Sequence, residues 1–336
     1  DKMKKYVEMV HKNNALMKIY YTVREMSNHI CEMGAFRSLD DEIFAYGPGE
    51  GDAWLREHLY DNYIPAWYDI SVKDAAIITS GMSRLHNYYL EGLDWLTKNV
   101  KIDGLYLDDV AYDRTVMKRA RKILDRNRPE ALIDLHSWNH YNKLAGFANN
   151  ANLYMESFPY IDRLWFGEVF DYENSTPDFW LIVISGIPYG LMGEMLGDNK
   201  GGNVYRGMVY GITNRLPWSG DPRNLWKFWD DYGIQGSEMI GYWDKNNPVK
   251  TNYDDILATT YLNNGKAIIA IASWNKSTQD VKLNIDWSKI GIKPENAEII
   301  SPEKKDFQNM NKYSLGDSIK IQPSKGIILV IREKNK

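Results

Sequence analysis

The sequence predicts an α/β fold in which a (β/α)8 TIM-like barrel, residues 1–250, is followed by an antiparallel β-sandwich, residues 251–336. In the first part, short apolar runs alternate with segments of helical periodicity, a pattern typical of a mainly parallel sheet with right-handed crossovers. The second part carries short β-branched runs separated by turns, without helices between them, which favours a sandwich. A length of 336 residues suits one large domain and one smaller one.

The composition excludes several classes of function. A formal net charge of −4, from 41 basic and 45 acidic residues, gives no field that would attract nucleic acid or a membrane surface. No apolar run approaches the roughly 18 residues needed to span a bilayer, so we expect no membrane insertion. Cys31 is the single cysteine, which excludes an intramolecular disulfide and a thiolate metal cluster. The composition predicts neither an oligomeric state nor a compartment.

The chain opens on a predicted helix. Residues 1–13 place apolar side chains on one helical face, at Met3, Tyr6, Val7 and Val10. Residues 16–23 then predict a strand that ends at the charged pair Arg24 and Glu25. A barrel that opens on a helix lacks its first strands, and we expect those strands upstream of this chain.

A glycine-rich loop, GPGEG at residues 47–51, precedes a predicted helix over residues 52–60. The loop lacks the Lys-Ser/Thr of a phosphate-binding loop, so we interpret it as a turn or an active-site lid. A further helix is predicted over residues 83–99, because its apolar positions recur three and four residues apart.

The remaining elements continue the alternation. The predicted barrel strands are residues 131–135, 152–156, 164–168, 191–195 and 238–243, and the predicted helices are residues 114–124, 176–187, 204–214 and 224–232. The predicted sandwich strands are residues 266–274, 281–287, 297–301, 318–322 and 326–331.

The stretch IDGLYLDDVAYD, residues 102–113, ends an apolar strand in two adjacent acids, Asp108 and Asp109. In a parallel α/β barrel the carboxyl ends of the strands face the active site, so acids there are catalytic candidates. The alternative is that an acid caps the following helix, a task for which Asp113 is better placed. The adjacent pair is therefore left for catalysis.

Polar residues stand at most predicted strand ends, and acids dominate them. They are Glu25, Asp108, Asp109, His136, Glu156, Glu168 and Glu194. Cleavage of a glycosidic bond needs one carboxyl group to protonate the leaving oxygen, and a second carboxylate, or a group of the substrate, to meet the cationic sugar. We therefore predict a glycoside hydrolase that acts on carbohydrate. Its catalytic candidates are Asp108, Asp109, Glu168 and Glu194.

Substrate contacts are predicted at the same end of the barrel. Aromatic residues make up 13% of the chain, and sugar rings stack on flat aromatic faces, although core packing is the commoner role of any one aromatic. Trp138 directly follows a strand end and is the first candidate. The full set of predicted substrate-binding residues is Glu25, His136, Trp138, Glu156, Trp165 and Trp218.

Metal binding is the competing use of these residues, since clustered carboxylates with histidine could hold a divalent ion. His136 and His140 are four residues apart, but they follow a strand, and the chain has no HExxH. It also has no GxSxG elbow and no GxGxxG dinucleotide fingerprint. We accordingly predict no metal and no other cofactor.

Three segments carry a resemblance to a known family. DGLYLDDVAYDR, MESFPYIDRLWFGE and GMVYGITNRLPW resemble the barrel domain of glycosidase-like proteins related to glycoside hydrolase family 123. The resemblance implies a (β/α)8 barrel, a secreted or periplasmic protein, and removal of terminal N-acetylgalactosamine by substrate-assisted retention. The family's adjacent Asp-Glu pair orients the acetamido group and supplies the general acid. By resemblance, Asp108 would be the orienting residue and Asp109, in place of Glu, the acid.

The sequence is also compatible with other mechanisms and other classes of protein. In a two-carboxylate scheme Asp108 would be the nucleophile and Glu168 or Glu194 the acid. Carboxyl groups about 5 Å apart would favour retention, and a separation of roughly 6.5 to 9.5 Å would favour inversion. Two rivals of another class are a catalytically silent carbohydrate-binding protein on the same fold and a metal-dependent hydrolase.

Overall fold

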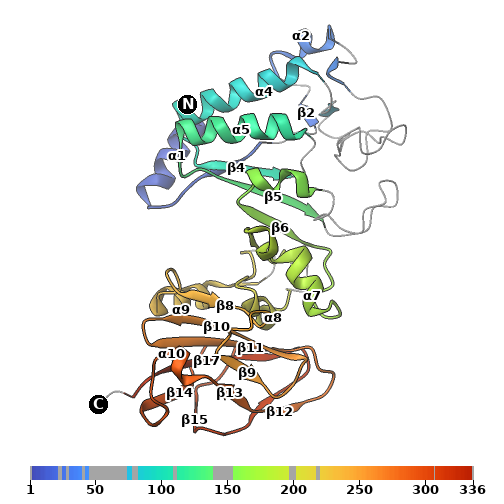
Figure 1. Ribbon diagram of the computed structural model, residues 1–336. Coiled ribbons are helices and arrows are strands. Elements are labelled where there is room, and N and C mark those ends of the chain that lie inside the picture. Colours follow the sequence, from blue (N-terminus) through green and yellow to red (C-terminus); the bar gives the residue numbers. More distant parts are fainter. Residues whose placement is uncertain are drawn as a thin grey trace. The chain divides into compact units, whose positions relative to one another are not determined.

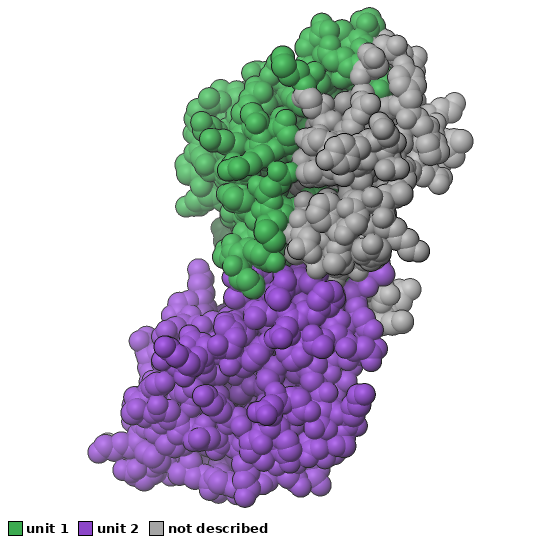
Figure 2. Space-filling model, turned by 45° about the vertical axis from the view of Figure 1, so that its right-hand side comes forward, with its two compact units in different colours: residues 1–167, 188–193 green, residues 168–187, 194–336 purple. Residues whose placement is uncertain are grey.

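The computed structural model describes most of the chain. The residues outside its description are 1, 22–24, 28–29, 40–41, 45–73, 78–81, 109–111, 139–153, 197–201, 217–219, 306 and 335–336. The chain divides into two compact units, coloured separately in Figure 2. The first holds residues 1–167 and 188–193, and the second holds residues 168–187 and 194–336. The loop and helix predicted over residues 47–60 lie outside the described residues.

The first unit is built on a five-stranded sheet (Figure 1). In spatial order its strands are β1 (Lys18–Tyr20), β4 (Gly104–Asp108), β5 (Leu132–Trp138), β6 (Arg163–Glu168) and β7 (Met192–Gly193). The pairs β1–β4, β4–β5 and β6–β7 are parallel. Sequence order thus matches spatial order, as the predicted barrel requires.

Three helices of this unit form where the sequence predicted them. They are α1 (Lys2–Lys12), α4 (Arg84–Trp95), which continues as the π-helical turn η3 (Leu96–Val100), and α5 (Arg114–Asn127). The side chain of Asp113 accepts a hydrogen bond from the Val116 N–H at 2.9 Å, which confirms that this acid caps α5. Ser83 caps α4 in the same way through the Leu85 N–H.

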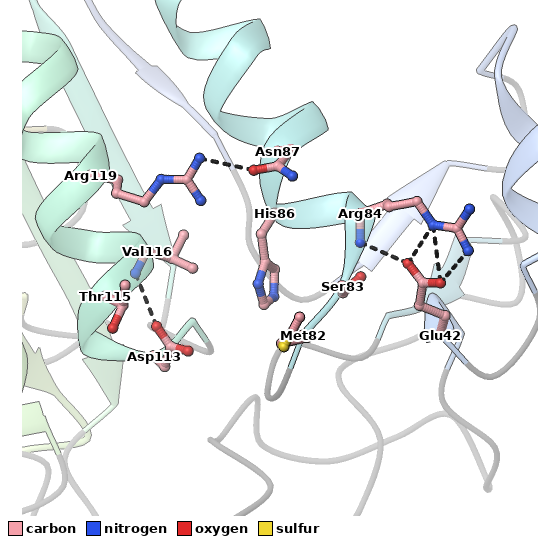
Figure 3. A pocket seen from close by; sticks show the side chains of 10 residues that line it. All are labelled: Glu42, Met82, Ser83, Arg84, His86, Asn87, Asp113, Thr115, Val116 and Arg119. Carbon is pink, nitrogen blue, oxygen red and sulfur yellow. Dashed lines mark hydrogen bonds and ion pairs between the residues drawn. The ribbon is translucent and has the colours of Figure 1, made fainter.

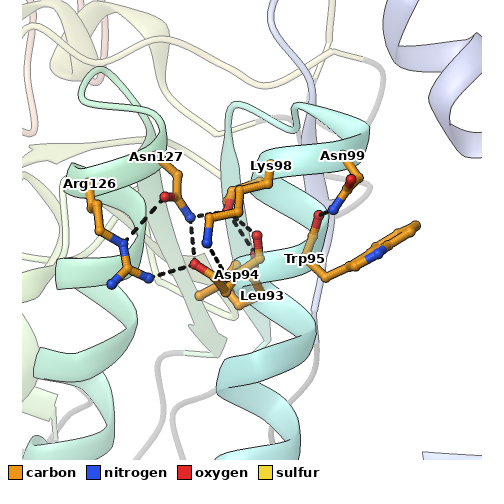
Figure 4. A network of polar contacts seen from close by, with 8 residues as sticks. Leu93, Asp94, Trp95, Lys98, Asn99, Arg126 and Asn127 are labelled. Atoms are coloured by element: carbon orange, nitrogen blue, oxygen red, sulfur yellow. Dashed lines mark hydrogen bonds and ion pairs between the residues drawn. The ribbon is translucent and has the colours of Figure 1, made fainter.

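Helices α4 and α5 lie side by side and are joined by polar contacts as well as apolar ones (Figure 4). Asp94 of α4 accepts hydrogen bonds from Arg126 at 2.6 Å and from Asn127 at 2.8 Å, both on α5. Lys98, one turn further along, also donates to Asp94 at 2.6 Å. These donors hold the pKa of Asp94 well below its ordinary value.

The sheet sorts its side chains by period-two alternation. One face carries apolar side chains that are completely buried in the core shared with α4 and α5: Leu105, Leu107, Ile133, Leu135, Leu164 and Phe166. The residues between them point to the opposite face, and they are mostly polar or aromatic. In a barrel the helices cover the outside, so this second face is the interior.

Asp103, directly before β4, ties three parts of the first unit together. It is 4% exposed and accepts hydrogen bonds from the Met17 N–H at 2.8 Å and from Arg128, and it lies 2.7 Å from His11. Burial alone would raise the pKa of this carboxyl, but the hydrogen bonds from Met17, His11 and Arg128 outweigh burial and lower it. The carboxylate of Asp103 therefore joins helix α1, the start of β1 and the end of α5.

Two predicted strand ends are wrong. The strand expected over residues 16–23 is described only as β1, and Glu25 opens a separate strand, β2 (Glu25–Ser27), which pairs antiparallel with β3 (Asp74–Ala76). Glu156 was expected at the end of a strand, yet it lies in the 3-10 helix η4 (Met155–Tyr160). Pro159 lies inside that helix, and its missing N–H does not suit a central strand.

The other short elements connect these parts. They are α2 (Met33–Arg37), α7 (Pro177–Phe179), the π-helical turn η5 (Trp180–Ile184) and the 3-10 helix η6 (Ile187–Tyr189). In the second unit, α8 (Val204–Val209) is shorter than predicted because Gly211 adopts a left-handed φ of 71°. Helix α9 (Arg223–Tyr232) follows the prediction closely.

The second unit is built on a six-stranded antiparallel sheet. Its strands in spatial order are β15 (Asn311–Tyr313), β14 (Ala297–Ser301), β17 (Gly326–Glu333), β11 (Lys266–Ser273), β10 (Ile256–Asn263) and β8 (Glu238–Ile240). Two small antiparallel sheets pair β12 (Gln279–Val281) with β16 (Ile319–Ile321), and β13 (Leu283–Ile285) with β9 (Val249–Thr251). Short helices α10 (Trp287–Ile290) and η7 (Pro294–Asn296) precede β14.

Both faces of the large sheet are buried. Along β11, Ile268 and Ala270 pack in one core with α8 and α9, while Ile269 and Ile271 pack in another with the small sheets. This explains the nearly continuous apolar run of β11. The predicted sandwich is confirmed, with two helices covering its second face.

The strand predicted over residues 238–243 as the last barrel strand is wrong. β8 pairs antiparallel with β10, with Ile240 opposite Thr260, and so belongs to the C-terminal sheet. A short run of strand-forming residues predicts that a strand forms, but not which sheet it joins. The boundary between domains at residue 250 stays a prediction.

Replacing Asp103 with Asn should destabilise the protein by about 3 kcal/mol, because Arg128 would lose the partner of a buried ion pair. The lowered pKa of Asp103 stabilises the fold above its ordinary value of 3.8, and this contribution is lost as pH falls through the folded-state value. Thermal melts between neutral and acidic pH should therefore show a steeper loss of Tm below pH 3.8 in the wild type than in the variant. Parallel curves would contradict the assignment.

Candidate active site

The carboxylate of Asp108 is held by groups from two neighbouring strands. Asp108 ends β4 and lies opposite His136 of β5 in the strand register. Its Oδ1 is 2.6 Å from His136 Nδ1, and its Oδ2 accepts a hydrogen bond from the Tyr20 hydroxyl of β1 at 2.8 Å. The side chains of Asp108 and His136 are 22% and 14% exposed, so solvent or a ligand can reach a carboxylate whose orientation is fixed.

Aromatic rings surround this carboxylate on the same face of the sheet. The ring of Tyr106, two residues before Asp108, stacks on the His136 imidazole with centroids 5.8 Å apart. It also meets the edge of Trp165 at 5.1 Å and lies 5.9 Å from the ring of Tyr20. Tyr106 therefore joins the aromatic groups of β1, β5 and β6 into one cluster.

A layer of charged side chains lies on the same face of the sheet, two residues earlier in each strand. Asp134, two residues before His136, is only 1% exposed. Lys18 of β1 lies 2.6 Å from its Oδ2, and the Arg163 guanidinium of β6 lies 3.2 Å from the same oxygen. Arg163 also lies over the Trp165 ring, 5.3 Å from its centroid. A buried carboxylate with two cations fixes the spacing of β1, β5 and β6 beneath the aromatic cluster.

Of the other predicted acids, two lie at strand ends and two do not. Glu168 is the last residue of β6, and Glu194 directly follows β7, so both stand at ends of strands as predicted. Both side chains are half-buried. Glu156 is exposed on η4, and Glu25 lies on β2, away from the predicted strand end. The catalytic and substrate-binding roles of these acids stay predictions.

Two of the three predicted tryptophans, Trp138 and Trp165, lie in described strands. Trp165 is 8% exposed, and its ring packs against Tyr106 and Arg163. The protein itself therefore already buries most of this side chain. Trp138 is the last residue of β5, inside the strand that it was expected to follow. Asp109 and Trp218 lie outside the described residues.

Sequence reasoning missed Tyr20, Lys18, Asp134 and Arg163. A signal for three of them exists, because polar residues at alternate positions of otherwise apolar strands point to the face opposite the helices. Asp134 precedes His136 by two residues, as Arg163 precedes Trp165 and Lys18 precedes Tyr20. The hydrogen bond of Tyr20 could not be predicted, because the pairing of β1 with β4 joins residues 88 apart.

A cavity of about 730 Å³ lies at the N-terminal ends of α4 and α5 (Figure 3). Arg84 binds Glu42 through two guanidinium nitrogens, and Arg119 donates to Asn87 at 2.8 Å. The imidazole of His86 points between these helix ends. None of the described residues lining this cavity belongs to the predicted site.

Within the described ranges, no group of three or more His, Cys, Asp or Glu side chains is arranged to hold a metal ion. In the same ranges no helix has the length and apolar character needed to cross a membrane.

The comparisons with known proteins agree with this architecture. A family model described as "Glycoside hydrolase 123, TIM-barrel domain" matches residues 1–217. The chain belongs to glycoside hydrolase family 123. A second model of that family, described as its C-terminal domain, matches residues 221–332. This glycoside hydrolase thus carries both domains of the family, and the resemblance noted in the sequence is confirmed. No curated protein matches the chain.

Solved structures that resemble this glycosidase include three α-amylases. The enzyme from Geobacillus thermoleovorans, in complex with acarbose, has a TM-score of 0.59 and 11% identity over 99% of this chain and 81% of its own. A noncanonic maltogenic α-amylase from Thermotoga neapolitana gives 0.59 and 12% over 99% and 81%. An Anoxybacillus α-amylase gives 0.60 and 12% over 99% and 79%. At such identities the likeness shows the fold alone, a TIM barrel followed by a β-sandwich.

Replacing Tyr20 with Phe should lower kcat of this glycosidase about tenfold, because a hydrogen bond to a charged group is worth roughly 1.5 kcal/mol or more. The stability should hardly change, since Tyr20 is 51% exposed. The measurement is turnover of an aryl glycoside that the wild type cleaves, with a thermal melt beside it.

Tyr21→Phe is the matched control. The Tyr21 hydroxyl donates to the Tyr89 carbonyl at 2.9 Å, so its loss should lower stability by about 1 kcal/mol and leave kcat unchanged. Equal losses of kcat in both variants would show that the Tyr20 hydroxyl has no special role.

Proposed function

We propose that this glycosidase cleaves the bond of a terminal N-acetylhexosamine in a complex glycan, with the substrate's acetamido oxygen as nucleophile and Asp108 as the residue that orients the acetamido group. The observation that supports this most is the pair of contacts at Asp108, with His136 at 2.6 Å and Tyr20 at 2.8 Å. The family membership supports the reaction class.

The contacts suit an orienting carboxylate better than a general acid. Each oxygen of Asp108 faces a hydrogen-bonding group, so the carboxylate acts as an acceptor whose plane is fixed. Each ionised oxygen can accept more than one hydrogen bond, and in this proposal one of them comes from the acetamido N–H. A carboxylate that accepts from that N–H turns the acetamido oxygen towards the anomeric carbon and stabilises the positive charge that develops there.

The general acid must then be another group. By the family resemblance it is Asp109, which lies outside the described residues. The alternative scheme uses Asp108 as nucleophile and Glu168 or Glu194 as acid, and the positions of these two at the ends of β6 and β7 keep it open. The two schemes differ in what they require of the substrate.

Aryl glycosides that differ only at the 2-position distinguish the schemes. With an acetamido nucleophile, the 2-acetamido substrate should be cleaved, and the 2-hydroxy analogue should lose about 10³-fold or more in kcat/KM. A trifluoroacetamido group should slow cleavage, because fluorine withdraws charge from the attacking oxygen. Comparable rates for the acetamido and hydroxyl substrates would favour the two-carboxylate scheme.

Asp108→Asn should lower kcat by about 10² to 10³, because the neutral amide no longer stabilises the developing charge. Binding of the sugar product, measured by calorimetry, should be retained. Asp113→Asn is the matched control, since Asn caps a helix about as well as Asp and α5 should stay intact. A wild-type chain that binds glycans but cleaves none of them would favour the silent carbohydrate-binding protein instead. Loss of cleavage on exhaustive chelation would favour the metal-dependent hydrolase.

A further inference from the structure

The second unit contains a pocket of its own, with a volume of about 490 Å³. Helix α7, the segment after β8, strand β9 and the start of β10 line it. The side chains that matter for its chemistry are Asp178, Tyr242, Lys250, Tyr253 and Asp254. All of them belong to the second unit, and none takes part in the site around Asp108.

One wall of this pocket is fixed through Tyr210, which is 3% exposed. The Tyr210 hydroxyl donates to the Pro177 carbonyl at 2.9 Å and lies 3.5 Å from the Tyr242 hydroxyl. Burial raises the pKa of Tyr242, so its hydroxyl stays neutral at physiological pH. α7 and Tyr242 are therefore held together from behind.

The opposite wall is fixed by Thr251. Its hydroxyl lies 2.8 Å from the Tyr253 carbonyl and 2.5 Å from the Ile256 carbonyl, and it accepts from the Tyr253 N–H at 3.2 Å. Tyr253 also packs against the apolar core of the small sheets. The turn that presents Tyr253 and Asp254 to the pocket is thus formed before any ligand arrives.

The polar ends of the pocket remain available. Among the described residues, no hydrogen bond or ion pair involves the side chains of Asp178, Lys250 and Asp254 or the hydroxyl of Tyr253. Asp178, Lys250 and Asp254 are exposed, and Tyr242 and Tyr253 are half-buried. The hydroxyls of Tyr210 and Thr251, which hold the walls, make their hydrogen bonds within the protein. Two carboxylates, one ammonium group and one tyrosine hydroxyl line the pocket.

This combination matches a neutral sugar. The apolar face of a pyranose packs on tyrosine rings, and its vicinal hydroxyls donate to carboxylates and accept from lysine and tyrosine. A divalent ion suits the pocket less well, because the two carboxylates are too few to satisfy a cation that takes six or more oxygens. The family membership makes carbohydrate the ligand class that this protein meets as substrate.

We propose that this pocket is a second carbohydrate-binding site, which holds a sugar unit of the glycan that the enzyme degrades. It rests on the glycosidase family membership and not on the acetamido mechanism proposed for Asp108. A single sugar in such a pocket should bind with a Kd of about 1 mM.

Hydrogen–deuterium exchange of the full chain tests the proposal. N-acetylgalactosamine, N-acetylglucosamine, galactose and glucose are added separately. At least one should slow exchange in residues 249–258, and this protection should report a Kd of about 1 mM. Residues 104–108 and 132–138 report binding at the Asp108 site in the same experiment.

The double variant Asp178→Asn with Asp254→Asn should raise the Kd reported by the protection of residues 249–258 about tenfold, because neutral amides accept weaker hydrogen bonds than carboxylates. Both side chains are exposed, so the fold should be unaffected. Asp280→Asn, an exposed acid of β12 outside the pocket, is the matched control and should change nothing.

Protection confined to residues 104–108 and 132–138 would overturn the second site and leave the proposed catalytic role of Asp108 intact. Protection of residues 249–258 that survives the double variant would overturn the assignment of the two carboxylates. The absence of protection of residues 249–258 with every sugar tested would also reject the proposal.

Discussion

The register between β4 and β5 is the constraint on which the candidate site depends. It places Gly104 opposite Leu132 and Asp108 opposite His136. A slip by one residue would turn Asp108 towards the apolar core and Leu107 towards the polar face. Gly104 is needed for this pairing, because a Cβ at that position would lie 1.9 Å from the Leu132 carbonyl oxygen. A glycine at one end of the strand thereby permits the contact of an acid at the other end.

The layers beneath Asp108 explain why its carboxylate can have a fixed orientation. Tyr20 and His136 hold its oxygens, Tyr106 holds the His136 ring, and the layer of Lys18, Asp134 and Arg163 holds the strands that carry them. A catalytic group is effective when neighbouring side chains fix its rotamer before the substrate binds. Buried ion pairs add little net stability, so we interpret the charged layer as a positioning device.

The second unit shows how the same alternation serves a different purpose. Its six-stranded sheet buries both faces, and neither face is left for chemistry. The buried Arg206 of α8 donates to the carbonyls of Tyr172 and Ser273 at 2.9 and 3.0 Å, so it links the segment before α7 to the C-terminal end of β11. The pocket proposed to hold a sugar is instead lined by α7, the segment after β8, β9 and the start of β10.

The sequence by itself determined most of the helices, the strands β4, β5 and β6, the Asp113 cap and the position of Asp108 at the end of a strand. Periodicity, capping residues and turn residues act over a few positions, which is why these features could be predicted. Only the tertiary structure decided that β8 joins the C-terminal sheet, that Glu156 lies on a 3-10 helix, and that Tyr20 meets Asp108. The first and the last depend on pairing between residues far apart in the chain, and a local pattern does not specify its partner.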